Sequence, residues 1–80
     1  MPVALSPRAE KDLGRLPPAM QSRIIAALGR YVETAHGDVR RLKGYDPPRA
    51  RLRVGDYRAI FREEGDTLLV LRVRHRKDAY

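Results

Sequence analysis

The chain has 80 residues, with 17 Lys or Arg against 10 Asp or Glu, a formal net charge of +7 and a sequence pI of about 10.6. This length allows one small domain over residues 1–80, in which about 60% of the unfolded surface becomes buried. The absence of cysteine excludes disulfides and thiolate metal sites, and two isolated histidines do not make a usual zinc site, so neither metal nor cofactor is expected. No apolar run approaches the roughly 20 residues of a membrane span and the N-terminus is charged, so we expect a cytoplasmic protein without membrane contact.

The first half of the chain predicts a short strand and two helices. Residues 2–5 can form the strand, and Ser6-Pro7 then has the N-cap and first-turn proline of a helix start. Pro17-Pro18 ends that helix and opens a second one, whose apolar stripe runs from Met20 to Val32. The two helices are therefore expected to form a helical hairpin.

The second half predicts three strands. Residues 38–48 are expected to be a loop, and from Arg49 the apolar spacing changes from helical to alternating. Glycine turns at Gly55-Asp56 and Gly65-Asp66 divide the alternating stretch. The predicted order is β-α-α-β-β-β, an α+β fold in which the helical hairpin packs on one face of a small, mostly antiparallel sheet.

Alternation gives this sheet one apolar face and one arginine face. The apolar face is expected to contain Leu52, Val54, Leu69, Leu71 and Val73. The opposite face is expected to carry Arg51, Arg53, Arg58, Arg72 and Arg74. Like charges directly opposite each other destabilise a sheet, so this concentration indicates a functional surface for an acidic macromolecule. The alternative is a basic surface that is solvated or covered by a partner's acidic segment.

No familiar enzyme motif is present. The sequence has no phosphate-binding glycine loop, no metal-ligand spacing and no serine or cysteine nucleophile in a recognisable setting. Arginines and a tyrosine suit cleavage of RNA, because guanidinium groups stabilise charge that develops on the phosphate. The RNA supplies its own nucleophile in the 2′-hydroxyl.

Three segments together resemble the RelE/ParE toxin superfamily: Leu42-Lys43-Gly44, residues 51–61 and residues 72–80. They match the family's LKG loop, its R-x-R-x-G-x-Y-R hairpin and its terminal HRxxxY strand, and the likeness covers essentially the whole chain. The resemblance implies a toxin of a type II toxin–antitoxin pair, neutralised by a cognate antitoxin. RelE-like members are similar to ribonucleases that cleave mRNA in the ribosomal A site, whereas ParE-like members act on DNA gyrase and lack the catalytic set.

The resemblance also implies roles for the arginines of the hairpin. Arg51 and Arg53 stand where RelE-like enzymes contact the RNA backbone, and Arg72 is counted with them as substrate-binding. Arg58 matches the arginine that holds the scissile phosphate. Generic surface charge is the alternative for Arg51 and Arg53, and a structural pairing with Asp56 or Asp78 is the alternative for Arg58.

The terminal segment carries the other implied catalytic residues. Arg74, and less closely Arg76, match the arginine that stabilises or protonates the leaving oxygen, and Tyr80 matches the tyrosine that stacks on a base or orients the 2′-hydroxyl. RelE enzymes place lysines on the first hairpin strand, but arginine stays protonated, so the general base here would be Tyr80 or His75. Strict alternation places His75 on the apolar face, which favours a structural role.

The leading hypothesis is a metal-independent, ribosome-dependent mRNA endoribonuclease whose partners are a cognate antitoxin and mRNA in the ribosomal A site. Two alternatives stay open. One is a ParE-like, non-enzymatic toxin that binds DNA gyrase. The other is an inactive relic that binds only its antitoxin.

Overall fold

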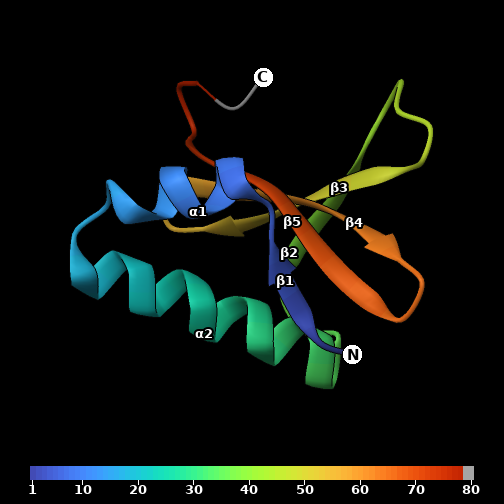
Figure 1. Ribbon diagram of the computed structural model, residues 1–80, viewed down its shortest axis with the longest axis horizontal. Helices are drawn as coiled ribbons and strands as arrows, with labels where there is room; N and C mark the ends of the chain where they lie inside the picture. Colours follow the sequence, from blue (N-terminus) through green and yellow to red (C-terminus); the bar gives the residue numbers. More distant parts are fainter. Residues whose placement is uncertain (79–80) are drawn as a thin grey trace.

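The computed structural model describes residues 1–78 of the chain, which form two helices and five strands. Their bounds are β1 Val3–Leu5, α1 Pro7–Gly14, α2 Pro18–Thr34, β2 Asp38–Leu42, β3 Arg49–Val54, β4 Tyr57–Glu64 and β5 Thr67–His75. The helical hairpin follows the first strand and precedes the others, as Figure 1 shows. The predicted α+β class is therefore confirmed.

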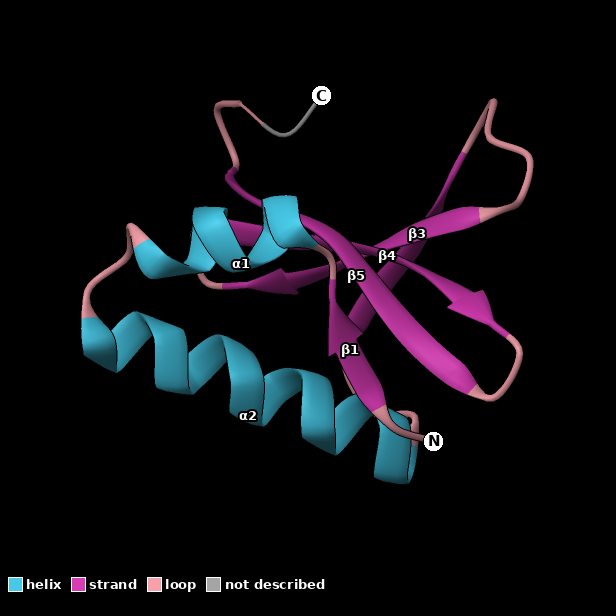
Figure 2. Cartoon of the chain, in the orientation of Figure 1, coloured by secondary structure: helices cyan, strands magenta, loops and turns pink. Residues whose placement is uncertain are grey.

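All five strands lie in one sheet, in the order β1-β5-β4-β3-β2 (Figure 2). β1 is parallel to β5, and every other neighbouring pair is antiparallel. β2 corrects the prediction of a loop over residues 38–48, since only residues 43–48 connect strands. It was missed because β2 is a polar edge strand without alternating apolar residues, and its pairing with β3 supplies the order that its own sequence does not indicate.

The helices are attached to the sheet by both polar and apolar contacts. Ser6 caps α1 by accepting a hydrogen bond from the Ala9 N–H (3.1 Å), and its hydroxyl donates to the Leu71 carbonyl of β5 (3.0 Å). The core lies between the hairpin and one face of the sheet, and its largest fully buried side chains are Ile24, Leu28, Leu52, Leu68 and Val70. Among residues 1–78, neither helix has the length and apolar character that a membrane crossing requires.

A β-bulge changes which side of β5 faces the core. Ile60 pairs with Arg72 and Phe61 pairs with Val70, so Leu71 is the extra residue on β5. Val73 faces the core as predicted, but Leu68 and Val70 are fully buried in place of Leu69 and Leu71, which are only half-buried. The prediction for those two leucines was therefore wrong, while the residues of β5 beyond the bulge keep their predicted faces.

Candidate nucleic-acid interface

The strand register arranges the side chains of the sheet face opposite the helices in rows, and two of these rows contain the predicted arginines. Directly paired residues of neighbouring strands place their side chains on the same face. In the first row, which lies nearest the β3–β4 turn, Arg53 pairs with Arg58 and Arg58 pairs with Arg74. We call this the tip row. Three guanidinium groups from three adjacent strands thus share one line, as the alternation predicted.

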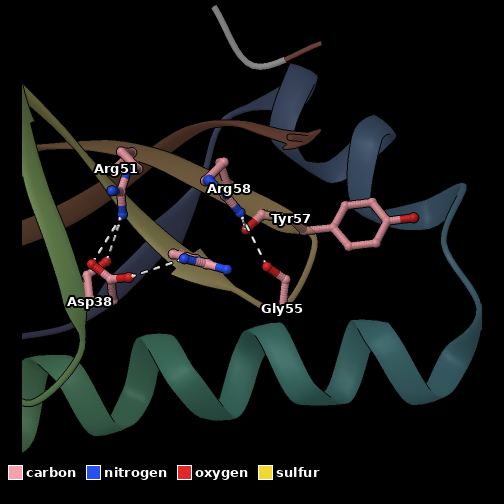
Figure 3. Close-up of polar contacts among 6 residues, drawn as sticks. Asp38, Arg51, Gly55, Tyr57 and Arg58 are labelled. Carbon is pink, nitrogen blue, oxygen red and sulfur yellow. Dashed lines mark hydrogen bonds and ion pairs between the residues drawn. The ribbon is translucent and has the colours of Figure 1, made fainter. Parts of the chain in front are cut away.

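Arg58 stands at the centre of the tip row and is held by the backbone of the adjacent turn. Its Nη1 donates to the carbonyl oxygens of Tyr57 (3.0 Å) and Gly55 (3.2 Å), as Figure 3 shows. No carboxylate within residues 1–78 forms an ion pair with it, so the expected alternative of pairing with Asp56 or Asp78 is not found there. Its Nε and Nη2 form no hydrogen bond within residues 1–78, and these donors suit two oxygens of one phosphate.

The two outer arginines of the tip row are weakly paired. Arg53 Nη1 lies 3.9 Å from Asp38 Oδ2, and both side chains are about half exposed to solvent. In the part of the chain that the structure describes, Arg74 forms neither a hydrogen bond nor an ion pair through its side chain. The tip row therefore carries close to its full positive charge, which an anionic ligand would neutralise.

The second row, called the middle row, is formed on β3, β4 and β5 by Arg51, Ile60 and Arg72, and these two arginines have carboxylate partners. Arg51 Nη1 donates to the Asp38 carbonyl (3.0 Å) and to Asp38 Oδ1 (3.4 Å), and its side chain is only 11% exposed (Figure 3). Arg72 Nε donates to Asp12 Oδ2 at 2.8 Å. Both arginines lie on the predicted face, but their guanidinium groups are less available to a ligand than those of the tip row.

The carboxylate of Asp12 joins α1 to β5. Its Oδ2 also accepts a hydrogen bond from the Val73 N–H (2.9 Å). Burial alone would raise the pKa of this carboxyl, but the hydrogen bonds from Arg72 and Val73 and the charges of Arg72 and Arg74 outweigh burial and lower it. The hydrogen bond to Asp12 in turn raises the pKa of Arg72. Sequence reasoning missed Asp12 because its partners lie 60 residues further along the chain.

The remaining predicted residues lie at or beyond the end of β5. Arg76 follows β5 in a turn, where its N–H donates to the Asp56 carbonyl (2.7 Å) and its Nε lies 3.9 Å from Asp56 Oδ1. It therefore lies beside the β3–β4 turn. Tyr80, the predicted catalytic tyrosine, lies outside the described residues.

His75 lies on the face opposite the arginines. It pairs with Tyr57 across β4 and β5, and the two rings meet edge to face with centroids 5.3 Å apart. Its Nδ1 accepts a hydrogen bond from the Lys77 N–H (3.3 Å). The predicted placement of His75 on the apolar face is confirmed, and this placement separates its ring from the tip row.

Comparisons with known proteins agree on one superfamily. The family described as "ParE toxin of type II toxin-antitoxin system, parDE" matches residues 3–80. The chain is 40% identical to Toxin RelG of Mycobacterium tuberculosis in an alignment of 88 positions that covers 98% of this chain and 93% of that protein.

Solved structures show the same relationship. The fold is similar to a chain of the RelB–RelE antitoxin–toxin complex from Methanococcus jannaschii, with a TM-score of 0.78, 30% identity and 96% and 94% of the two chains covered. A chain of the archaeal RelE–RelB complex from Pyrococcus horikoshii is also similar, with a TM-score of 0.78, 25% identity and 98% and 97% covered. The sequence match over nearly the whole length, together with this fold, shows that the chain belongs to the RelE/ParE toxin superfamily of type II toxin–antitoxin systems.

Proposed function

We propose that this toxin is a metal-independent endoribonuclease that cleaves mRNA in the ribosomal A site. The tip row is the observation that carries the proposal. Arg53, Arg58 and Arg74 are direct neighbours on three strands, and repulsion among them costs stability that a bound phosphate would recover. The RelE names of the similar proteins also support a ribonuclease over a gyrase inhibitor.

In the proposed reaction, the 2′-oxygen of one nucleotide attacks the adjacent phosphorus and the bond from phosphorus to the 5′-oxygen breaks. The products are a 2′,3′-cyclic phosphate and a free 5′-hydroxyl. Arg58 holds the non-bridging phosphate oxygens through its Nε and Nη2 donors and stabilises the negative charge that grows on them. Arg74, and Arg76 beyond it, stabilise the leaving 5′-oxygen, which takes a proton from solvent water. Arg51, Arg53 and Arg72 contribute to the positive field along the RNA backbone.

The 2′-hydroxyl must lose a proton to a base. Arginine cannot accept it, because its pKa keeps it protonated. His75 is unsuited, since its ring packs against Tyr57 on the other face of the sheet. We therefore assign to Tyr80 the role of orienting or deprotonating the 2′-hydroxyl, which requires the positive field of the arginines to lower the pKa of its phenol.

The proposed partners follow from the family and from charge. The similar solved structures are antitoxin–toxin complexes, and a net charge of +7 suits an acidic antitoxin that neutralises the toxin in the cytoplasm. The second partner is the translating ribosome with its mRNA.

The decisive experiment adds the purified chain to a reconstituted translation system and maps mRNA ends by primer extension. We expect cuts within codons in the A site, and we expect Arg58→Ala to reduce cleavage at least a hundredfold. Arg62→Ala is the matched control, because Arg62 lies on the same strand and face but is bonded to Glu64 at 3.0 Å. It is expected to cleave like the wild type.

A parallel assay of DNA supercoiling by gyrase separates the alternatives. Intact mRNA with stalled supercoiling would replace the proposal with a ParE-like toxin. Intact mRNA and normal supercoiling, with binding of the antitoxin retained, would identify an inactive relic.

A further inference from the structure

We propose that a hollow between α2 and the end of β3 is a second phosphate site, which binds the RNA backbone outside the scissile nucleotide. The inference deepens the proposed function and depends on RNA being the target. The hollow has a volume of about 280 Å³. Arg23, Ala27 and Arg30 of α2 line one side of it, and Arg53 and Gly55 of the β3–β4 hairpin line the other.

The three residues of α2 that line the hollow lie on one face of the helix because of their spacing in the sequence. Ala27 and Arg30 follow Arg23 by four and seven residues, so the three residues share one face of the helix. The small Ala27 leaves room between two long cationic side chains. Neither Arg23 nor Arg30 forms an ion pair among the first 78 residues, and both are exposed.

The β3–β4 turn beside the hollow requires glycine, both for its backbone conformation and for the close approach of Arg23. Gly55 has a positive φ of +59°, and a Cβ added there would lie 3.1 Å from Arg23 Nη1. The Arg23 guanidinium therefore lies directly against the turn whose carbonyl holds Arg58. Arg23 and Arg58 thus both lie beside Gly55, one on each side of the sheet.

Arg53 connects the hollow to the tip row, since it belongs to both. The path of positive charge runs from Arg74 through Arg58 and Arg53 and then around the end of β3 to α2. Among the described residues that line the hollow, the one carboxylate is that of Asp38, and its Oδ1 already accepts a hydrogen bond from Arg51 (3.4 Å). The hollow thus has three arginines, Arg23, Arg30 and Arg53, and one carboxylate that is already paired. The excess positive charge favours binding of an anion.

Continuity with the tip row favours RNA over an acidic peptide as the occupant. An RNA strand whose scissile phosphate lies on Arg58 passes Arg53 near the end of β3, and its next phosphates can reach Arg23 and Arg30. Guanidinium groups bind phosphate oxygens in pairs and release counterions from the nucleic acid when they do. An acidic segment of the antitoxin is the competing occupant.

The test measures binding of a fluorescent single-stranded RNA, with every 2′-hydroxyl methylated so that it cannot be cleaved, by anisotropy at several salt concentrations. For the double variant Arg23→Gln/Arg30→Gln we expect the slope of log K against log salt to fall by about 1.4, since each lost phosphate contact on a single strand removes about 0.7. The matched control is Arg41→Gln/Lys43→Gln, with the same loss of charge at the far end of the β2–β3 hairpin. Its slope is expected to stay near that of the wild type.

Three outcomes would overturn the inference: an unchanged slope in the α2 variant, an equal fall in the control, or weakened binding of the antitoxin with RNA binding unchanged. Because the RNA cannot be cut, the slope is independent of catalysis. If the wild type fails to cleave mRNA, the proposed function fails, whereas a slope that stays constant while cleavage is normal refutes only the α2 site.

Discussion

Asp12 and Arg72 are joined by two hydrogen bonds, from Arg72 Nε to Oδ2 (2.8 Å) and from Arg72 Nη2 to Oδ1 (3.3 Å). This pair explains how β5 is supported beyond the end of β1, which pairs with β5 only as far as Val70. The Val73 N–H would otherwise face an open sheet edge, and Asp12 supplies its acceptor. A helix carboxylate thus fixes the part of β5 from which Arg74 projects.

The lowered pKa of Asp12 predicts an acid-dependent loss of stability. A carboxyl whose pKa is lower in the folded than in the unfolded state stabilises the fold above about pH 4, and this contribution disappears as the pH falls through the folded-state value. Asp12→Asn lacks that contribution. We therefore expect its free energy of unfolding at pH 7 to be about 2 kcal/mol lower than that of the wild type. Urea unfolding from pH 7 to pH 3 measures the difference, which is expected to shrink below pH 4. A difference that stays constant or widens would contradict the assignment.

Most of the fold followed from local signals in the sequence. Ser6-Pro7 and Pro17-Pro18 marked the helix starts, and the change of period at Arg49 marked the strands. The bulge on β5 could not be predicted in this way. Residues 68–71 are all apolar, so alternation fits either face, and the opposing strand decides which side is buried.

The candidate site likewise has a part that local sequence signals predict and a part that they do not. The arginines of the tip row could be predicted, because the tight turn at Gly55 fixes the pairing of β3 with β4 and alternation then fixes the face. The carboxylates that bind the middle row could not. Asp38 lies 13 residues from Arg51 and Asp12 lies 60 residues from Arg72, so only the assembled sheet brings these pairs together.

This division between rows predicts different effects for two arginines of the same face. Arg72→Gln breaks the contact with Asp12, so we expect a loss of about 1–2 kcal/mol in unfolding free energy and cleavage within about threefold of the wild type. Arg58→Gln is expected to show the reverse, with cleavage reduced at least a hundredfold and stability nearly unchanged. Urea unfolding and primer extension on both variants provide the comparison. A large loss of cleavage by well-folded Arg72→Gln would show that Arg72 contacts the substrate directly and contributes more than long-range charge.

The glycines of the two hairpin turns allow a paired test of the Arg23 contact. Gly55 and Gly65 have similar positive φ values of +59° and +63°, so alanine at either position is strained by about 1–2 kcal/mol. A Cβ at Gly65 meets nothing within 4 Å, whereas one at Gly55 meets Arg23. Both variants are expected to lose similar stability, and only Gly55→Ala is expected to weaken the salt dependence of RNA binding. Equal salt slopes in the two variants would argue against a role of Arg23 at the turn.

The bulge on β5 predicts that alanine substitution of two adjacent leucines lowers the free energy of unfolding by different amounts. Leu68 is fully buried in the core, and Leu69 lies half-buried on the arginine face opposite Arg62. Leu68→Ala is expected to cost about 2–5 kcal/mol of unfolding free energy, because it leaves a cavity between the sheet and the helices. Leu69→Ala removes the same atoms from a partly solvated surface, and we expect it to cost less than about 1.5 kcal/mol. Urea unfolding of both variants measures the two values. If Leu69→Ala were the more damaging change, β5 would have the uninterrupted alternation that its sequence also permits, and Val70 would face the arginines.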